Sequence, residues 1–388
     1  MNCRERLLAV YEGNEPDRTP ITIFITDTDI EDGPPDCVLG KRSNDTIAEL
    51  LRFHEILGID IMLRVSAPVF EPIAFNVDTG NWKNNWRLKE DGKHLVHRIS
   101  TPDADLQETF NLEGEEFHGD YSEDWMKLRN IRIEPLIKGE RDLELIKKHR
   151  PTIPVYDLSD IQEIKQRLGQ RGIILPRVPS SVFNYAVGLM KLEELLTAPI
   201  LKPQFYKELM ALCENDVTRV GVEIARAGSD VVRVVGNIAN SGMVSVDFYR
   251  EHVYPYEKRY VEALAAEGCK VLFHNCGQCA SLLAVYREML DGQALESLST
   301  PATGGDVSDL KTAREALGDN VVMVGNFDQV QLLRNGTPAQ VRQQVRKTLD
   351  QTAGDSRFIF STSDSIIPGT PGENVHALAE AALQYVNR

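Results

Sequence analysis

The chain has 388 residues, of which 42% are hydrophobic and 26% charged, and its formal net charge is −15. This acidic balance argues against nucleic acids and anionic membranes as partners, and no apolar run reaches the roughly 20 residues that span a bilayer. The N-terminus lacks the apolar core of a signal peptide, and six scattered cysteines do not suggest a disulfide framework. We therefore expect a globular, cytoplasmic protein with reduced thiols.

Short apolar runs and helical patterns alternate along the chain. A short amphipathic helix is predicted at residues 4–11, and eight runs that end in polar or turn residues follow it. The runs cover residues 20–25, 59–65, 172–178, 231–236, 270–276, 294–299, 321–327 and 358–364. Eight strands alternating with helices indicate a single (β/α)8 TIM-type barrel domain over residues 1–388. An open doubly wound sheet is the alternative, but no G-x-G-x-x-G motif follows the first run.

One segment, residues 72–132, interrupts this alternation between the second and third strands. It is polar, it holds all three tryptophans, and residues 93–99 and 106–111 alternate like edge strands. We interpret it as inserted β-hairpins that pack on the rim of the barrel. A surface elaboration without chemistry is favoured over a substrate lid, although loops on a barrel do carry function.

A histidine and a cysteine end the fifth apolar run, in the stretch KVLFHNCGQCA. In (β/α)8 enzymes the active site lies at the carboxyl ends of the strands. His274 and Cys276 alternate along a strand and therefore point to the same side. An imidazole and a thiolate side by side suit zinc. The alternative for this pair is a satisfied histidine beside a buried thiol.

A glutamate interrupts the next apolar run, ALESL, on the strand expected beside that of His274. A buried carboxylate needs a partner or a metal, and adjacent strand ends are close enough to share one ion. Glu296 would then join His274 and Cys276 as a third ligand. Three ligands with an open position are the layout of a catalytic zinc site.

The other strand ends offer candidate substrate contacts, which rest on position alone. They are Asp27, Arg64, Arg177, Arg233, Asn237, Asn240 and Asn326. An arginine at such a place is able to hold a substrate carboxylate through two parallel hydrogen bonds. Because an unpaired charge inside an apolar run is costly, Arg233 is expected to pair with an interior carboxylate or a bound anion.

Several stretches together resemble the uroporphyrinogen decarboxylase-like superfamily, which includes zinc-dependent corrinoid methyltransferases. They are RERLLAVYEGNEPDRTPI, PLIKGERDLELIKK, VSVDFYREHVYPYEKRYVEALAAEGCKVLFHNCG, VGNFD and IIPGTPGENVHALAEAA. In the methyltransferases, zinc is bound by a His-x-Cys pair, often a later glutamate, and a late cysteine. The resemblance implies His274, Cys276 and Glu296 as ligands. The late cysteine aligns with residues 363–364, so Asp364 or a water is expected in its place. The N-terminal motifs of true uroporphyrinogen decarboxylases are absent, which argues against porphyrinogen decarboxylation.

The single thiolate predicts the kind of methyl transfer, because zinc with few thiolates is a better Lewis acid toward a hard oxygen. We expect an O-demethylase component that moves a methyl group from a methoxylated, aromatic donor to the Co(I) corrinoid (cobalamin) of a partner protein. The resemblance implies this partner, since the chain lacks a corrinoid-binding Asp-x-His-x-x-Gly motif. Transfer from a corrinoid protein to a thiol or tetrahydrofolate, a metal-free decarboxylase and a noncatalytic barrel stay open, as does a homodimer.

Overall fold

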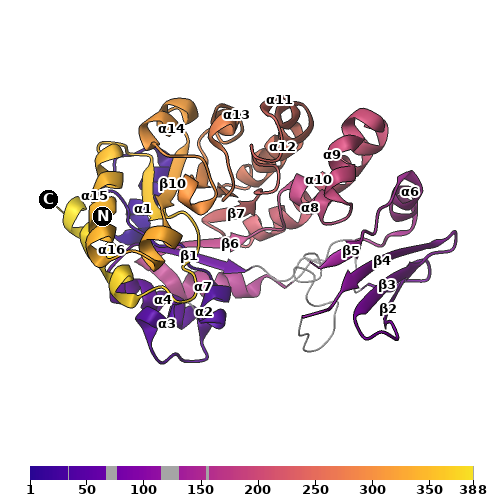
Figure 1. The fold of residues 1–388 in the computed structure, drawn as a ribbon, viewed down its shortest axis with the longest axis horizontal. Helices are drawn as coiled ribbons and strands as arrows, with labels where there is room; N and C mark the ends of the chain where they lie inside the picture. The colour runs from indigo at the N-terminus through magenta and orange to yellow at the C-terminus, as the bar shows by residue number, and fades with distance from the viewer. Residues whose placement is uncertain (34, 67–76, 115–130, 154–156, 388) are drawn as a thin grey trace. The chain divides into compact units, whose positions relative to one another are not determined.

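The computed structural model describes residues 1–33, 35–66, 77–114, 131–153 and 157–387 (Figure 1). The chain divides into two compact units. The barrel unit comprises Met1–Ala67, Asp157–Ser181 and Gly221–Arg388, and the second unit comprises Pro68–Tyr156 and Val182–Val220. Within the described residues, no helix is both long and apolar enough to cross a membrane.

In the described part of the barrel unit, parallel strands form one sheet in the order β1-β6-β7-β8-β9-β10-β11. The strands are β1 (Ile61–Ser66), β6 (Gly172–Arg177), β7 (Val231–Val235), β8 (Lys270–Asn275), β9 (Ala294–Ser297), β10 (Val322–Phe327) and β11 (Phe358–Thr362). They are buried almost throughout, as parallel strands covered by helices must be. The spatial order follows the chain order, which confirms the predicted barrel-type fold.

The first predicted strand is irregular. Isolated parallel bridges join Ile21 to β11 and Thr26 to β1, so this segment lies between the two outer strands of the sheet and closes the ring. Side chains bind two of its amides: the Ile21 amide donates to Asp60 at 2.9 Å and the Phe24 amide to Thr362 at 3.0 Å. Because side chains satisfy these donors, the segment needs no regular ladder here.

Helices cover the outer face of the strands in the barrel unit (Figure 1). Helices α4, α7, α12 and α15 pack on β1, β6, β8 and β10, respectively. The helices of this unit are α1 (Cys3–Glu12), α2 (Asp27–Asp32), α3 (Asp36–Leu39), α4 (Thr46–Leu57), α7 (Ser159–Leu168), α11 (Val246–Phe248), α12 (Tyr254–Ala265), α13 (Leu283–Met289), α14 (Leu310–Leu317), α15 (Pro338–Gln351) and α16 (Gly372–Val386). The predicted alternation of strands and helices is therefore present.

Helix α1 closes the amino-terminal end of the strands. Asn2 and Glu5 form a capping box at its start, and Gly13 ends it in the left-handed conformation that glycine adopts without strain. Its buried side chains Leu7, Val10 and Tyr11 pack against the first residues of the barrel strands. The opposite, carboxyl-terminal end of the strands is therefore the end left for a site.

The second unit is built on an antiparallel sheet in the order β2-β3-β4-β5. Its strands are β2 (Lys83–Leu88), β3 (His94–Ser100), β4 (Asp105–Asn111) and β5 (Arg132–Glu134), and its helices are α6 (Glu140–His149), α8 (Val182–Val187), α9 (Leu192–Leu201) and the first part of α10 (Pro203–Arg226). Leu95 and Phe110 form a small core with Trp86. The predicted hairpins are therefore present, although residues 72–76 and 115–130 of the predicted segment lie outside the described residues.

Candidate metal centre

Three of the predicted ligands come together at the carboxyl ends of two strands. His274 lies on β8, Cys276 follows β8, and Asp364 follows β11. Each offers one ligand atom, and these atoms all lie within 4.8 Å of one another. Nε2 of His274 is 4.0 Å from Oδ2 of Asp364. This is the end of a barrel where active sites are built.

The orientation of the His274 ring is fixed by a carboxylate behind it. Nδ1 lies 3.0 Å from Oε2 of Glu296, the residue that faces His274 in the register of β8 and β9. An ionised carboxylate only accepts hydrogen bonds, so Nδ1 must carry a proton. Nε2 is then the atom available to the cluster. The carboxylate of the cluster, that of Asp364, is about a third exposed.

The charge state of His274 reflects opposing effects. Burial and the charge of Arg233 lower its pKa, but the contacts with Cys276, Glu296 and Asp364 outweigh them and raise the pKa to about 9. A metal ligand must offer an unprotonated nitrogen, so metal binding at Nε2 would release a proton.

Glu296 does not belong to this cluster, although the sequence predicted it as a ligand. Its side chain is fully buried, and Oε1 accepts from Arg64 Nη2 at 2.6 Å and from Nε at 3.2 Å. Oε2 accepts from Arg233 Nε at 3.3 Å and from His274. Burial raises the pKa of Glu296, but Arg64, the His274 hydrogen bond and Arg233 hold it well below its usual range. The carboxylate is therefore ionised and shared among three nitrogen-bearing side chains.

Both interior arginines also contact one aromatic ring. The guanidinium carbons of Arg64 and Arg233 each lie 4.6 Å from the ring centroid of Phe24, within the range of cation–π attraction. The prediction that Arg233 pairs with an interior carboxylate is confirmed. Arg64, predicted as a substrate contact, is 1% exposed and turned onto Glu296. Phe24 was not predicted, because an apolar residue at a strand end carries no distinctive signal.

Two predicted asparagines lie beside Cys276. The Nδ2 group of Asn237 donates to Sγ of Cys276 at 3.4 Å, and Nδ2 of Asn240 donates to the carbonyl of Asn237 at 2.8 Å. Asn240 also accepts from the amide of Gly242 at 2.9 Å. The loop after β7 is thus tied together next to the thiol.

The remaining predicted contacts are more scattered. Asp27 accepts from the amide and the hydroxyl of Ser66, at 2.6 and 3.0 Å, and so holds the end of β1. Arg177 is the last residue of β6 and is partly buried, whereas Asn326 is buried on β10.

Two further residues border the cluster and were not predicted as site residues. Asp29 accepts from the hydroxyl of Ser365 at 2.8 Å; burial raises its pKa, against the hydrogen bonds that it accepts, and the charge of Asp364 raises it further. Ser297 places its hydroxyl 3.2 Å from Nδ1 of His274 and has a φ of 97°. A positive φ is uncommon for a serine, and the local sequence does not predict it.

The donor set fits a zinc ion. Zinc–ligand bonds of about 2.0–2.3 Å place tetrahedral ligand atoms about 3.3–3.8 Å apart. Atoms within 4.8 Å of one another need only a small contraction to reach that spacing, and the partly exposed Asp364 has room to make it. One imidazole, one thiolate and one carboxylate leave a fourth position open, as catalytic zinc sites do.

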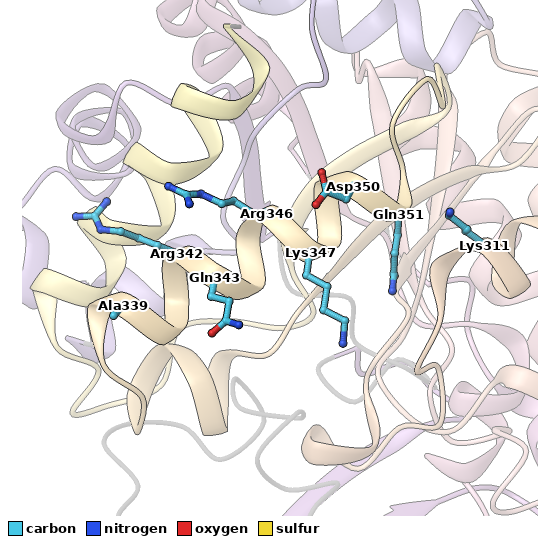
Figure 2. Close-up of a pocket in the computed structure, with 8 residues that line it drawn as sticks. All are labelled: Lys311, Ala339, Arg342, Gln343, Arg346, Lys347, Asp350 and Gln351. Atoms are coloured by element: carbon cyan, nitrogen blue, oxygen red, sulfur yellow. The ribbon is translucent and has the colours of Figure 1, made fainter.

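A separate surface cavity of about 710 Å³ lies on helices α14 and α15 (Figure 2). Most of its charged side chains are basic: Lys311, Arg342, Arg346 and Lys347 are joined by a single acidic residue, Asp350. The residues that line it include none of the predicted site residues, so this cavity is not part of the metal centre.

Comparison with known proteins places the chain among relatives with two kinds of activity. The sequence model described as uroporphyrinogen decarboxylase (URO-D) matches residues 134–385. The methylcobamide:CoM methyltransferase MtbA of Methanosarcina acetivorans is 25% identical over 264 residues, which cover 65% of this chain and 71% of that protein. The uroporphyrinogen decarboxylase of Pelobacter propionicus is 29% identical over 193 residues, which cover 48% of this chain and 51% of that protein.

A third relative and one solved structure add to this. The methylated-thiol–coenzyme M methyltransferase of Methanosarcina mazei is 24% identical over 232 residues, covering 60% of this chain and 58% of that protein. A solved structure of a methyltransferase from Methanosarcina mazei superposes with a TM-score of 0.64 at 16% identity and covers 99% of both chains. At that identity the likeness shows the fold alone.

Proposed function

Because the chain belongs to the uroporphyrinogen decarboxylase family, we propose that it is the zinc-dependent methyltransferase predicted from its sequence. It transfers a methyl group from a methoxylated aromatic donor to the Co(I) corrinoid of a separate partner protein. The observation that carries this proposal is the meeting of His274, Cys276 and Asp364 at the active-site end of the strands. The named methyltransferases among the relatives support the same class of reaction.

The composition of the cluster supports an oxygen-bound methyl group as the donor. With one thiolate among its ligands, zinc would supply Lewis acidity toward a hard oxygen. In the transfer, the electron pair of Co(I) forms the new bond to the methyl carbon, and the pair of the broken C–O bond stays on the leaving oxygen. Neutralising that oxygen is the difficult part, because alkoxides and phenolates leave poorly.

Residues of the chain prepare the site for this reaction. The side-chain amide of Asn237 donates to the sulfur of Cys276 and so orients it beside His274. Arg233 brings a positive charge that a single shared carboxylate, Glu296, does not fully neutralise, since Arg64 binds it too. The positive charge within this group of three side chains would favour a donor that carries a carboxylate.

A second candidate is the transfer of a methyl group from a corrinoid protein to a thiol. The names of two relatives favour it, since they are methyltransferases of coenzyme M. The single thiolate of the cluster favours the first candidate, because the resemblance associates thiol activation with several thiolates on zinc.

Metal analysis tests the site first. We expect about one zinc per purified chain and its loss in His274→Ala and Cys276→Ala. Cys279→Ala is the matched control, because Cys279 is a second cysteine three residues on but lies outside the cluster. Burial raises the pKa of the Cys279 thiol to about 12, so it stays protonated. Zinc that persists in Cys276→Ala would contradict the proposed site.

Activity assays then test the reaction. The protein is incubated with a Co(I) corrinoid protein and a panel of methoxyaromatics, and formation of methylcobalamin is followed by absorbance. Methyl transfer from the corrinoid, the second candidate, is assayed with methylcobalamin and thiols or tetrahydrofolate. Transfer only from methyl ethers supports the first candidate, and transfer only to thiols supports the second. The absence of transfer in both directions would refute both.

A further inference from the structure

The carboxylate of Glu296 is saturated by protein donors. An ionised carboxylate offers about four lone-pair sites. Arg64 fills two of them on Oε1, at 2.6 and 3.2 Å. On Oε2, Arg233 and His274 take the other two, at 3.3 and 3.0 Å. A carboxylate in this state has no acceptor site left for a metal ion.

The backbone holds Glu296 in this place. It lies on β9 between His274 of β8 and Val324 of β10 in the sheet register, and its side chain is fully buried. Gly325 follows on β10, where a Cβ atom would lie 2.4 Å from the carbonyl oxygen of Ser297. The backbones of β9 and β10 are thus in close approach beside Glu296, which leaves β9 no room to move toward β10.

We propose that Glu296 is a positioning residue, which acts on the metal ligand His274 through Nδ1 and does not bind the metal itself. It keeps the proton on Nδ1 and leaves Nε2 facing the cluster, 4.0 Å from Oδ2 of Asp364. The Arg64 and Arg233 guanidiniums fix the carboxylate in turn. The inference rests on the proposed zinc site and deepens it, because it assigns the metal three protein ligands, with Asp364 as the carboxylate among them.

Glu296→Gln tests this role through the chemistry of the amide. The amide has one accepting oxygen and one donating nitrogen. If the oxygen faces Arg64, the nitrogen faces Nδ1 of His274, which must then accept. The ring proton moves to Nε2 and blocks the metal-binding atom. Loss of such an orienting partner lowers metal affinity by about 10–100-fold.

The experiment compares three variants with the wild type. Zinc affinity is measured by competition with a chelator, and the absorption spectrum of the Co²⁺-substituted protein is recorded at saturating metal. Glu296→Gln should lower affinity by about 10–100-fold but leave the cobalt spectrum unchanged, because the ligand set is the same. Asp364→Asn should change that spectrum, because a ligand atom is replaced.

Asp230→Asn is the matched control. Asp230 is also a buried carboxylate between two cations: Arg4 binds it at 2.6 and 2.7 Å and Lys165 at 2.9 Å. It precedes β7, at the opposite end of the strands, so its variant should keep the zinc affinity of the wild type. A parallel loss of affinity in Asp230→Asn would mean that the effect in Glu296→Gln is general destabilisation and would overturn the proposal.

Three results separate the positioning role from the zinc site itself. A wild type that binds no zinc overturns both. A wild type that binds zinc, with unchanged affinity in Glu296→Gln, overturns only the positioning role. A cobalt spectrum of Glu296→Gln that is altered as in Asp364→Asn would make Glu296 a ligand and also overturn only that role.

A measurement on the wild type covers the case in which Glu296→Gln does not fold. The eight histidines are labelled with ¹⁵N, and the ring signals of the zinc-loaded protein are recorded by NMR. The signals absent from His274→Ala belong to His274. The proposal requires a protonated Nδ1 and a metal-bound Nε2, and the reverse arrangement would refute it.

Discussion

At the scale of single residues, buried histidines show how the fold decides protonation. His54 of α4 is fully buried, and its Nδ1 lies 2.8 Å from the carbonyl of Leu50. A carbonyl only accepts, so Nδ1 donates, while Nε2 has no hydrogen-bond partner. Burial therefore lowers the pKa of His54 from its ordinary 6.5 to about 4, although the bond to Leu50 opposes this.

This shift predicts a loss of stability in acid. Between pH 6.5 and about 4, His54 is protonated in the unfolded chain but neutral in the folded chain. The free energy of unfolding therefore falls as the pH falls. The slope from this residue is about 1.4 kcal/mol per pH unit. His54→Asn keeps a donor but does not titrate, so urea unfolding at a series of pH values should show a flatter dependence.

His376→Asn serves as the control for that comparison. His376 lies on α16 and is only partly buried, so its variant shows the effect of replacing a histidine that is not enclosed in the core. If His54→Asn and the wild type lose stability in parallel below pH 6.5, another group carries the acid sensitivity.

The same scale shows what the sequence could and could not predict about the site. His274 and Cys276 were found because a histidine and a cysteine two residues apart end an apolar run, and Asp364 because it aligns with a family ligand. Glu296 was recognised as a buried carboxylate in need of a partner. Its partners, however, come from strands far apart in sequence, and only the sheet brings Arg64 and Arg233 to it. Local patterns do not contain that information.

At the scale of elements, helix α1 is short but contributes strongly to the stability of the barrel unit. Leu7 and Val10 are fully buried in a core cluster that also contains residues of all seven described barrel strands. Arg6 adds an ion pair to Asp60 at 2.6 Å, and Asp60 also accepts from the amide of Ile21. Helix α1 therefore stabilises both the amino-terminal end of the barrel strands and the irregular first strand that closes the ring.

Leu7→Ala should therefore be costly. Removing a fully buried leucine side chain leaves a cavity where the strands converge, and the expected loss is about 2–5 kcal/mol in the free energy of unfolding. Urea denaturation followed by circular dichroism measures it. Leu8→Ala is the control, because Leu8 is only partly buried against the same core, and it should lose clearly less. Equal losses in the two variants would contradict the assigned role of α1.

Element boundaries were predicted well where burial sets them. Seven of the eight apolar runs coincide with parallel strands to within a few residues, because a strand covered on both faces must be apolar throughout. The first run differs, since Asp60 and Thr362 bind its amides from outside the run. A sequence pattern records which residues are buried, but not which side chains will replace a backbone partner.

At the scale of the whole molecule, the chain is two compact units, and the candidate chemistry lies in one of them. His274, Cys276 and Asp364 all belong to the barrel unit, as do Glu296 and Arg64. The second unit has a core and a buried charge network of its own. In that network Asp216 accepts from both terminal nitrogens of Arg150 and, at 3.1 Å, from the hydroxyl of Tyr185.

This division predicts that stability and metal binding respond separately to a change in the second unit. Asp216→Ala leaves Arg150 buried without its partner, and breaking a buried pair in this way costs about 3–5 kcal/mol. Unfolding of the second unit should occur at lower urea, whereas zinc affinity, measured by chelator competition in native buffer, should equal that of the wild type.

Arg150→Ala should have the same two effects, because it leaves the charge of Asp216 buried without its partner. A zinc affinity that falls together with stability in both variants would mean that the metal centre depends on the second unit, and the assignment of the site to the barrel unit alone would be wrong.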